Sequence, residues 1–347
     1  MAKRIERAFS VRRPDLEDLA ALLSPAASPF LEQMANQAQR LTRQHFGKII
    51  ELFIPLYLSN HCVSGCSYCG FASDRPIERK RLTLEEIDQE VLTLAQEGYD
   101  EILLLTGESC GAEDFLYLLE AIKRCRRFFN RVTVEAFPME LGNYRRLVEA
   151  GLFSVTVYQE TYQRELYEKV HRWGKKQDFG YRLDTPERAL EAGSRGVGLG
   201  VLLGLGEPRE DLICLAAHLQ WLYQRHWDAL FSVSFPRLRP EVGGFSGTYA
   251  VTNREQAQFI YAFRIVFPKF HLVLSTRETE AMRDNLAGVG ISKMSVGSRT
   301  TVGGYHQASG GACQFEIADH RSREAFCAAL AQRGLMGVYK NWDRSLR

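Results

Sequence analysis

Short apolar runs alternate with longer amphipathic segments along most of the chain, starting near residue 51. Short runs of apolar and β-branched residues, bounded by glycine or polar residues, are typical of buried strands. Eight such runs occur, at residues 51–59, 100–106, 131–137, 153–158, 197–203, 229–235, 271–275 and 291–297. The pattern therefore predicts eight strands separated by helices.

The segments between the runs carry the end signals of helices. Thr83 followed by Glu86 predicts a capping box, and Gly98 predicts the end of the same helix. Thr185 precedes a proline, which suits the first position of another helix. A further segment has an apolar stripe at helical spacing, formed by Leu212, Leu215, Leu219 and Leu222.

Residues 1–50 have a helical pattern of their own, with amphipathic stretches at 14–25 and 29–47. We expect a helical extension over residues 1–50, followed by one domain over 51–347 that ends in a C-terminal tail. Eight repeats of strand and helix indicate a parallel sheet, and eight is the number of units in a (β/α)8 TIM-type barrel. A doubly wound open sheet is the alternative, because the pattern alone does not distinguish the two.

Composition and charge exclude several classes of protein. The 347 residues are 45% apolar and 25% charged, as in globular proteins, and the net charge of +2 lacks the basic excess of a nucleic-acid binder. The first residues are charged, and no apolar run approaches the roughly 18–20 residues that span a bilayer. We expect a cytoplasmic protein without a membrane or nucleic-acid partner.

Three cysteines, Cys62, Cys66 and Cys69, lie within eight residues directly after the first predicted strand. A structural zinc site needs four ligands, so a zinc site here would need a distant fourth residue. Three thiolates can also hold a four-iron cluster and leave one iron open to a small molecule. The other five cysteines are scattered and form no second motif: Cys110, Cys125, Cys214, Cys313 and Cys327.

The carboxyl ends of barrel strands form the active-site mouth, and the cysteine trio follows one of these ends. Polar residues follow the other predicted strands as well. Together they predict a cavity lined by carboxylates, guanidiniums and hydroxyls: Thr106, Glu108, Glu135, Tyr158, Glu160, Glu207, Ser234, Arg237, Ser275, Arg277, Ser295 and Arg299.

These motifs resemble those of the radical S-adenosylmethionine (SAM) superfamily. Its C-x3-C-x-aromatic-C loop is matched by Cys62, Cys66, Tyr68 and Cys69. Its glycine-acid motif resembles residues 106–108, and its G-x-I-x-G-x-x-E motif resembles residues 200–207, with leucine in place of isoleucine.

Within the superfamily, the chain resembles the tyrosine lyases of bacterial thiazole synthesis, the 2-iminoacetate synthases, over residues ~19–345. The stretches that carry this resemblance are LLSPAAS, QRLTRQHFG, PLYLSN, YCGF, VYQETY, GKKQDF, YRLDTPER, SVSFPRLRP, LSTRE, GGY and KNWD. The resemblance implies a 4Fe-4S cluster that reductively cleaves SAM, and a radical that removes an amino hydrogen from L-tyrosine. The Cα–Cβ bond then breaks to give 2-iminoacetate and p-cresol. Thiazole synthase is the implied protein partner, and a flavodoxin-type protein is the implied electron donor.

The resemblance also implies roles for individual residues. The three cysteines are the implied cluster ligands, and Arg277 is expected to bind the tyrosine carboxylate with Tyr57 and Ser295 nearby. The residues expected to contact SAM are Tyr68, Phe71, Gly107, Glu108, Glu160, Arg182, Gly204 and Glu207.

Two other functions stay open from the sequence. A related lyase could act on tryptophan, and a barrel without activity could hold zinc. The tyrosine lyase of hydrogenase maturation carries an additional cysteine-rich C-terminal domain, for which we expect no room after residue 347.

Overall fold

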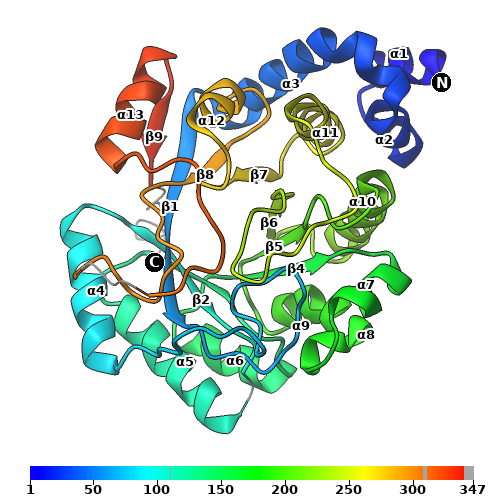
Figure 1. Cartoon of the computed structure of the whole chain (residues 1–347). Helices are drawn as coiled ribbons and strands as arrows, with labels where there is room; N and C mark the ends of the chain where they lie inside the picture. The colour runs from blue at the N-terminus through cyan, green and yellow to red at the C-terminus, as the bar shows by residue number, and fades with distance from the viewer. Residues whose placement is uncertain (110, 308–310, 340–347) are drawn as a thin grey trace.

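The computed structural model shows a closed barrel of parallel strands surrounded by helices (Figure 1). It describes residues 1–109, 111–307 and 311–339, so the KNWD stretch at 340–343 and Cys110 lie outside the described residues. Strand β1 pairs with β2 along one edge and with β8 along the other, which closes the sheet on itself. The barrel strands are β1 Ile49–Ser59, β2 Glu101–Thr106, β3 Arg131–Glu135, β4 Ser154–Glu160, β5 Gly196–Val201, β6 Leu230–Ser234, β7 His271–Leu274 and β8 Lys293–Ser295.

The predicted barrel is confirmed and the open sheet is excluded. Each of the eight apolar runs overlaps one strand of the barrel. The last run matches least well, since β8 ends at Ser295 and the left-handed backbone of Gly297, with φ of 62°, turns the chain away. All residues of β1 from Ile50 onward are buried, because one face meets the helices and the other fills the barrel.

Helices connect consecutive strands, and most of the predicted end signals are confirmed. Thr83 and Glu86 form the expected capping box, and the four leucines of the predicted stripe are fully buried in α10. The prediction for Thr185 is shifted by one residue. Asp184 is the N-cap, and the Thr185 hydroxyl donates to the carbonyl of Tyr181 instead. The helices are α4 Leu84–Gln96, α5 Ala112–Cys125, α6 Leu141–Glu149, α7 Arg164–Val170, η2 Lys175–Gln177, α8 Phe179–Leu183, α9 Thr185–Glu191, α10 Pro208–Arg225, α11 Asn253–Val266, α12 Glu280–Leu286 and α13 Arg323–Gln332.

Four helical segments precede the barrel and pack on its outside, near α10 and α11 (Figure 1). The Thr42 hydroxyl accepts a hydrogen bond from Gly290 N at 3.1 Å, which ties the last of them to the barrel. The buried carboxylate of Asp18 pairs with Arg4 and Arg7, so the first two helices are held together by ion pairs. The segments are α1 Ala2–Ser10, α2 Leu16–Leu23, η1 Pro25–Phe30 and α3 Leu31–Phe46.

A ninth strand, β9 Met336–Val338, extends the sheet and has no counterpart among the predicted runs. Glu51 pairs with Lys293 of β8 and with Val338 of β9, so β9 lies on the opposite edge of β1 from β8. Three residues with a central glycine are too short to give a periodic signal, which explains why the sequence pattern does not predict it.

Buried ion pairs close the amino end of the barrel. Glu51 Oε1 lies 3.0 Å from Arg131 Nη1 and 2.9 Å from Lys293 Nζ, and Lys293 also contacts Glu101. These residues stand at the starts of β1, β2, β3 and β8. The interior of the barrel is therefore blocked at this end, and a cavity can open only at the carboxyl ends of the strands.

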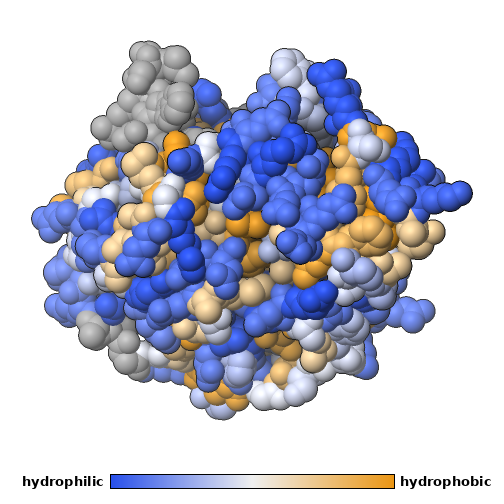
Figure 2. All heavy atoms as spheres, turned by 90° about the horizontal axis from the view of Figure 1, so that it is seen from above, coloured by the Kyte–Doolittle hydropathy of each residue, from blue (hydrophilic) through white to orange (hydrophobic). Residues whose placement is uncertain are grey.

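In the described part of the chain, no helix is long and apolar enough to cross a bilayer. The side of the molecule in Figure 2 is mostly hydrophilic, with apolar residues in separate patches.

Candidate active site

The three clustered cysteines line one cavity at the carboxyl end of the barrel. Cys66 is 4% exposed, and Cys62 and Cys69 are partly exposed. Backbone N–H groups approach two of the sulfur atoms: Ser64 N lies 3.4 Å from Cys62 Sγ, and Phe71 N lies 3.4 Å from Cys69 Sγ. N–H donors of this kind help to set the reduction potential of iron–sulfur clusters. Residues 60–71, which we call the cysteine loop, therefore provide hydrogen-bond donors that suit a cluster.

Burial raises the pKa of the Cys66 thiol to about 12, and it also raises the pKa of Cys62 and Cys69. The positive charge of Lys176 lowers the pKa of Cys66 and Cys69 and so opposes this effect. Such thiols become thiolates when a metal takes the place of the proton. No group of three histidines, cysteines or acidic residues in the described part of the chain is arranged to hold a single ion. In a four-iron cluster each thiolate binds a different iron atom. Three thiols spread around one cavity therefore suit a cluster better than a single metal ion.

Gly107 explains why the glycine-acid motif needs its glycine. A Cβ atom at this position would lie 2.2 Å from the carbonyl oxygen of His61, in the cysteine loop. The next residue also contacts the loop, because Val63 N donates to Glu108 O at 2.8 Å. The end of β2 therefore lies directly against the cysteine loop, which leaves no space for a side chain.

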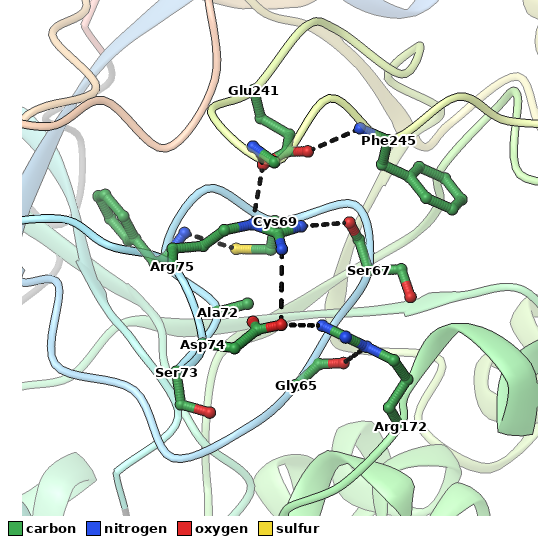
Figure 3. A network of polar contacts seen from close by, with 12 residues as sticks. Gly65, Ser67, Cys69, Ala72, Ser73, Asp74, Arg75, Arg172, Glu241 and Phe245 are labelled. Atoms are coloured by element: carbon green, nitrogen blue, oxygen red, sulfur yellow. Dashed lines mark hydrogen bonds and ion pairs between the residues drawn. The ribbon is translucent and has the colours of Figure 1, made fainter.

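A network of polar contacts holds the cysteine loop from its outer side (Figure 3). Arg75 donates to the carbonyl of Ser67 at 2.6 Å and to Glu241 Oε2 at 3.2 Å. The Glu241 side chain is fully buried and also accepts from Gly243 N and Phe245 N. The loop after β6 is thereby fixed to the backbone between Cys66 and Cys69.

The chain after α7 holds the cysteine loop from another direction. Arg172 donates to the carbonyl of Gly65 at 3.0 Å and to Asp74 Oδ2 at 2.7 Å (Figure 3). His171 Nδ1 lies 2.8 Å from the carbonyl of Tyr167, so its Nε2 accepts the Tyr68 hydroxyl at 2.7 Å. Burial lowers the pKa of His171 to about 2, which keeps the ring neutral in this role.

Two carboxylates predicted to contact SAM face the cavity, and each is paired with a cation. Glu108 Oε1 lies 2.7 Å from Arg182 Nη1, and Glu108 Oε2 is buried without a hydrogen-bond partner in the described part of the chain. Glu160 Oε1 lies 2.7 Å from Lys176 Nζ. Glu160 is also the one non-glycine residue with positive φ, 71°, in the part of the chain that the structure describes. Such strain is concentrated at functional sites.

The cavity continues into the barrel, so that it has two sides. The thiol side is lined by the three cysteines, and the inner side by Ser295 and residues of β1 and β7. The empty volumes of the two sides are about 890 and 580 Å³, and both values include space that is open to solvent. The residues that line both sides are Tyr57, Leu105, Glu135, Tyr158, Pro236, Arg277, Gln314 and Phe315.

Arg277 lies where the two sides meet. Its Cζ atom is 3.4 Å from the centroid of the Phe315 ring. Within the described residues its guanidinium forms neither an ion pair nor a hydrogen bond, and burial lowers its pKa. A partly buried cation without a partner among the described residues favours binding of an anion. Tyr57 and Ser295 line the inner side with it, so the structure brings the three predicted substrate contacts together.

The structure does not place Gly204 and Glu207 among the lining residues of this cavity, and their contact with SAM stays a prediction. Gly204 lines a separate hollow with the loop after β6. Glu207 is exposed and caps α10, where it accepts from Arg209 N at 3.0 Å and pairs with the Arg209 guanidinium. Its sequence position matches the last residue of the G-x-I-x-G-x-x-E motif, and in the structure its side chain caps the helix that follows. Of that motif, Leu202 reaches the cavity.

The remaining predicted contacts, Tyr68 and Phe71, line the thiol side. Sequence reasoning assigned no role to Lys176 or Gln314. Lys176 belongs to the GKKQDF stretch, so the resemblance could have identified it. Gln314 accepts from the Tyr57 hydroxyl at 2.7 Å, and its Nε2 lies 3.7 Å from Cys69 Sγ. No motif surrounds Gln314, and nothing in the sequence indicates this position.

Comparison with known proteins agrees with this geometry. The sequence profile of the radical SAM superfamily matches residues 56–219, and that of the biotin and thiamin synthesis associated domain matches residues 234–336. The chain is 42% identical to 2-iminoacetate synthase of Escherichia coli (strain K12) over 99% of its own length and 91% of that protein.

Two further relatives support the same assignment. The chain is 41% identical to the 2-iminoacetate synthase of Salmonella typhimurium, covering 98% of this chain and 90% of the relative. The structure of the FeFe-hydrogenase maturase HydG from Carboxydothermus hydrogenoformans superposes with a TM-score of 0.91 at 33% identity, over 98% of this chain and 79% of that one. The cysteine loop, the barrel and the near full-length identity together show that the chain belongs to the radical SAM superfamily and, within it, to the family of 2-iminoacetate synthases.

Proposed function

We propose that the protein is a radical SAM lyase that cleaves the Cα–Cβ bond of L-tyrosine to 2-iminoacetate and p-cresol, for the synthesis of the thiamine thiazole. The observation that carries the proposal is one cavity whose walls include three thiols and, at its inner side, an unpaired guanidinium. The first feature suits a cluster that activates SAM. The second suits the carboxylate of an amino-acid substrate.

As in the rest of the family, the cofactors are a 4Fe-4S cluster and SAM, which when bound supply the radical that removes a hydrogen atom from the tyrosine amino group. Cys62, Cys66 and Cys69 would hold the cluster. The free Glu108 Oε2 atom is available to the SAM ammonium, and Arg182 beside it favours the SAM carboxylate. Glu160, with its strained backbone, is the candidate for the ribose hydroxyls.

Arg277 would orient the substrate through its carboxylate. A guanidinium binds a carboxylate by two parallel hydrogen bonds, which fixes both position and rotation. With the carboxylate fixed, the amino group of tyrosine is turned toward the thiol side. The Tyr57 and Ser295 hydroxyls line the inner side and provide further hydrogen-bonding groups. The closed amino end of the barrel keeps water from the radical steps.

The proposal includes partners and a location. 2-Iminoacetate hydrolyses in water, so direct transfer to thiazole synthase would protect the product. A flavodoxin-type protein would supply the electron, and both partners are consistent with a cytoplasmic enzyme.

Anaerobic reconstitution followed by turnover with SAM and a reductant tests the proposal. The expected protein is brown, holds about four iron and four sulfide per chain, and converts tyrosine to p-cresol and 5′-deoxyadenosine. Formation of 3-methylindole from tryptophan, with no product from tyrosine, would instead identify a tryptophan lyase. A colourless protein that retains zinc would identify a metal scaffold.

A further inference from the structure

Glu135 ends β3 and stands where the two sides of the cavity meet. Its backbone is in register with Leu105 of β2, near the carboxyl end of the barrel. The side chain lines both the thiol side and the inner side. A molecule that extends from Arg277 toward the cysteine loop would therefore lie along this carboxylate.

Among the charged residues that the structure describes in the cavity, one anion and one cation are free. Glu108 and Glu160 are each paired with a basic residue, as described above. Among the described residues, the Glu135 carboxylate has no hydrogen bond or ion pair, and the Arg277 guanidinium has none either. An α-amino acid carries one carboxylate and one ammonium close together. The two free groups are therefore complementary to the charges of this substrate class.

Resting on the function proposed above, we propose that Glu135 is the catalytic base that accepts a proton from the ammonium group of bound tyrosine before the hydrogen atom is removed. One N–H bond breaks, its electron pair stays on nitrogen, and the proton goes to a Glu135 carboxylate oxygen. The step gives a neutral amine and a neutral carboxylic acid, with no change of oxidation state and no further reactant.

The proton transfer prepares the radical step. The N–H bond of a neutral amine gives up a hydrogen atom to a carbon radical more readily than that of an ammonium group. The aminyl radical then becomes the neutral imine of 2-iminoacetate and releases the side chain as a 4-hydroxybenzyl radical, which takes up one electron from the reductant and one proton to give p-cresol. The step therefore needs a base that lies beside the amine while Arg277 holds the carboxylate. Glu135 occupies such a position.

The surroundings of Glu135 suit a base that works near neutral pH. Burial raises its pKa to about 7, and repulsion by Glu160 acts in the same direction. A carboxyl group in this range accepts an amine proton at smaller cost than an ordinary carboxyl group near pH 4. The charged and titratable groups that act on it come from other elements of the barrel and its loops: Tyr57, Tyr158, Glu160, Lys176, Arg182 and Arg277.

The test compares Glu135→Gln with the wild type and with Glu140→Gln, a matched control at an exposed site outside the cavity. The variants are loaded with cluster, and p-cresol and 5′-deoxyadenosine are measured from pH 6 to 9. Cluster content and calorimetric tyrosine affinity are measured on the same samples. The control is expected to match the wild type in every measurement.

We expect Glu135→Gln to load its cluster, bind tyrosine and cleave SAM without substrate, while p-cresol formation falls by roughly 10²–10⁴-fold. The wild-type rate at saturating tyrosine should rise through about pH 7 and then level, because the base must be ionised. The residual rate of the Gln variant should keep rising about tenfold per pH unit, as more substrate arrives with a neutral amine. Glu135→Asp should retain the wild-type profile at a lower rate.

A Gln variant with near wild-type p-cresol, or with a reduced rate but the wild-type pH profile, would overturn the assignment. Loss of cluster loading in both the Gln and Asp variants would also overturn it, because Glu135 would then be a structural residue. Failure of the proposed function is a separate outcome, in which the loaded wild type gives no p-cresol from tyrosine at any pH.

Discussion

Replacing Arg277 by lysine removes the fork that can hold the substrate carboxylate and keeps the positive charge. The guanidinium has no competing partner among the described residues and is stacked on Phe315, so its orientation is set before substrate binds. Lysine would keep one of the two hydrogen bonds to the carboxylate. A hydrogen bond to a charged group contributes about 1.5–3 kcal/mol, and each 1.36 kcal/mol is a factor of ten in rate, so kcat/KM should fall roughly 10- to 150-fold.

The assay measures p-cresol and 5′-deoxyadenosine in the same samples as a function of tyrosine concentration. Because the substitution leaves the cysteine loop intact, the cluster should assemble, and slow SAM cleavage without tyrosine should persist. Arg299→Lys is the matched control, since that guanidinium also stacks on an aromatic ring, Tyr305, but is exposed and lies outside the cavity. Near-normal p-cresol formation with unchanged tyrosine dependence in Arg277→Lys would refute the reasoning and show that the carboxylate binds elsewhere.

Three further substitutions test the cysteine loop and its supports. Cys66→Ala should abolish cluster loading and SAM cleavage, whereas the control Cys214→Ala on α10 should affect neither. Equal loss of iron in both variants would mean that the cluster ligands are misassigned. Gly107→Ala should lower cluster content and shift the cluster's electron paramagnetic resonance signal, because its Cβ would lie 2.2 Å from the loop backbone; an unchanged signal at full iron content would contradict this. Arg75→Met should lower the free energy of unfolding of the apoprotein in urea by about 3–5 kcal/mol, because it leaves the buried Glu241 carboxylate without its cation. Adding Glu241→Gln should restore part of that loss, and additive effects of the two changes would show that the residues do not interact.

Most strands of the barrel could be predicted because they are largely buried on both faces and therefore appear as short apolar runs. The cysteine loop could be predicted because its ligands are adjacent in sequence. β9 could not, since three residues carry no period, and its place beside β1 depends on where the chain returns after α13.

The partners of the charged residues in the site also lay beyond sequence reasoning. Glu160 and Arg182 were identified as cavity residues, but the pairing of Glu160 with Lys176 and of Arg182 with Glu108 depends on how the loops after different strands meet. For Glu207 the sequence motif predicts a cofactor contact, whereas the structure adds a role that the motif does not indicate, the cap of α10. Glu135 was visible as a strand-end carboxylate, but only the fold shows that no described residue pairs with it.

A single turnover experiment in D2O tests the central claim, that a radical formed from SAM removes an amino hydrogen of tyrosine and thereby breaks the Cα–Cβ bond. The amino and phenol hydrogens of tyrosine exchange with solvent, whereas those on carbon do not, so the label distinguishes removal of an N–H or O–H hydrogen from removal of one on carbon. The products are quantified by mass spectrometry after anaerobic reaction of the loaded protein with SAM, reductant and tyrosine. The account predicts p-cresol and 5′-deoxyadenosine in equal amounts, with one solvent deuterium in the 5′-deoxyadenosine. Unlabelled 5′-deoxyadenosine formed together with p-cresol, or 5′-deoxyadenosine without p-cresol, would contradict it.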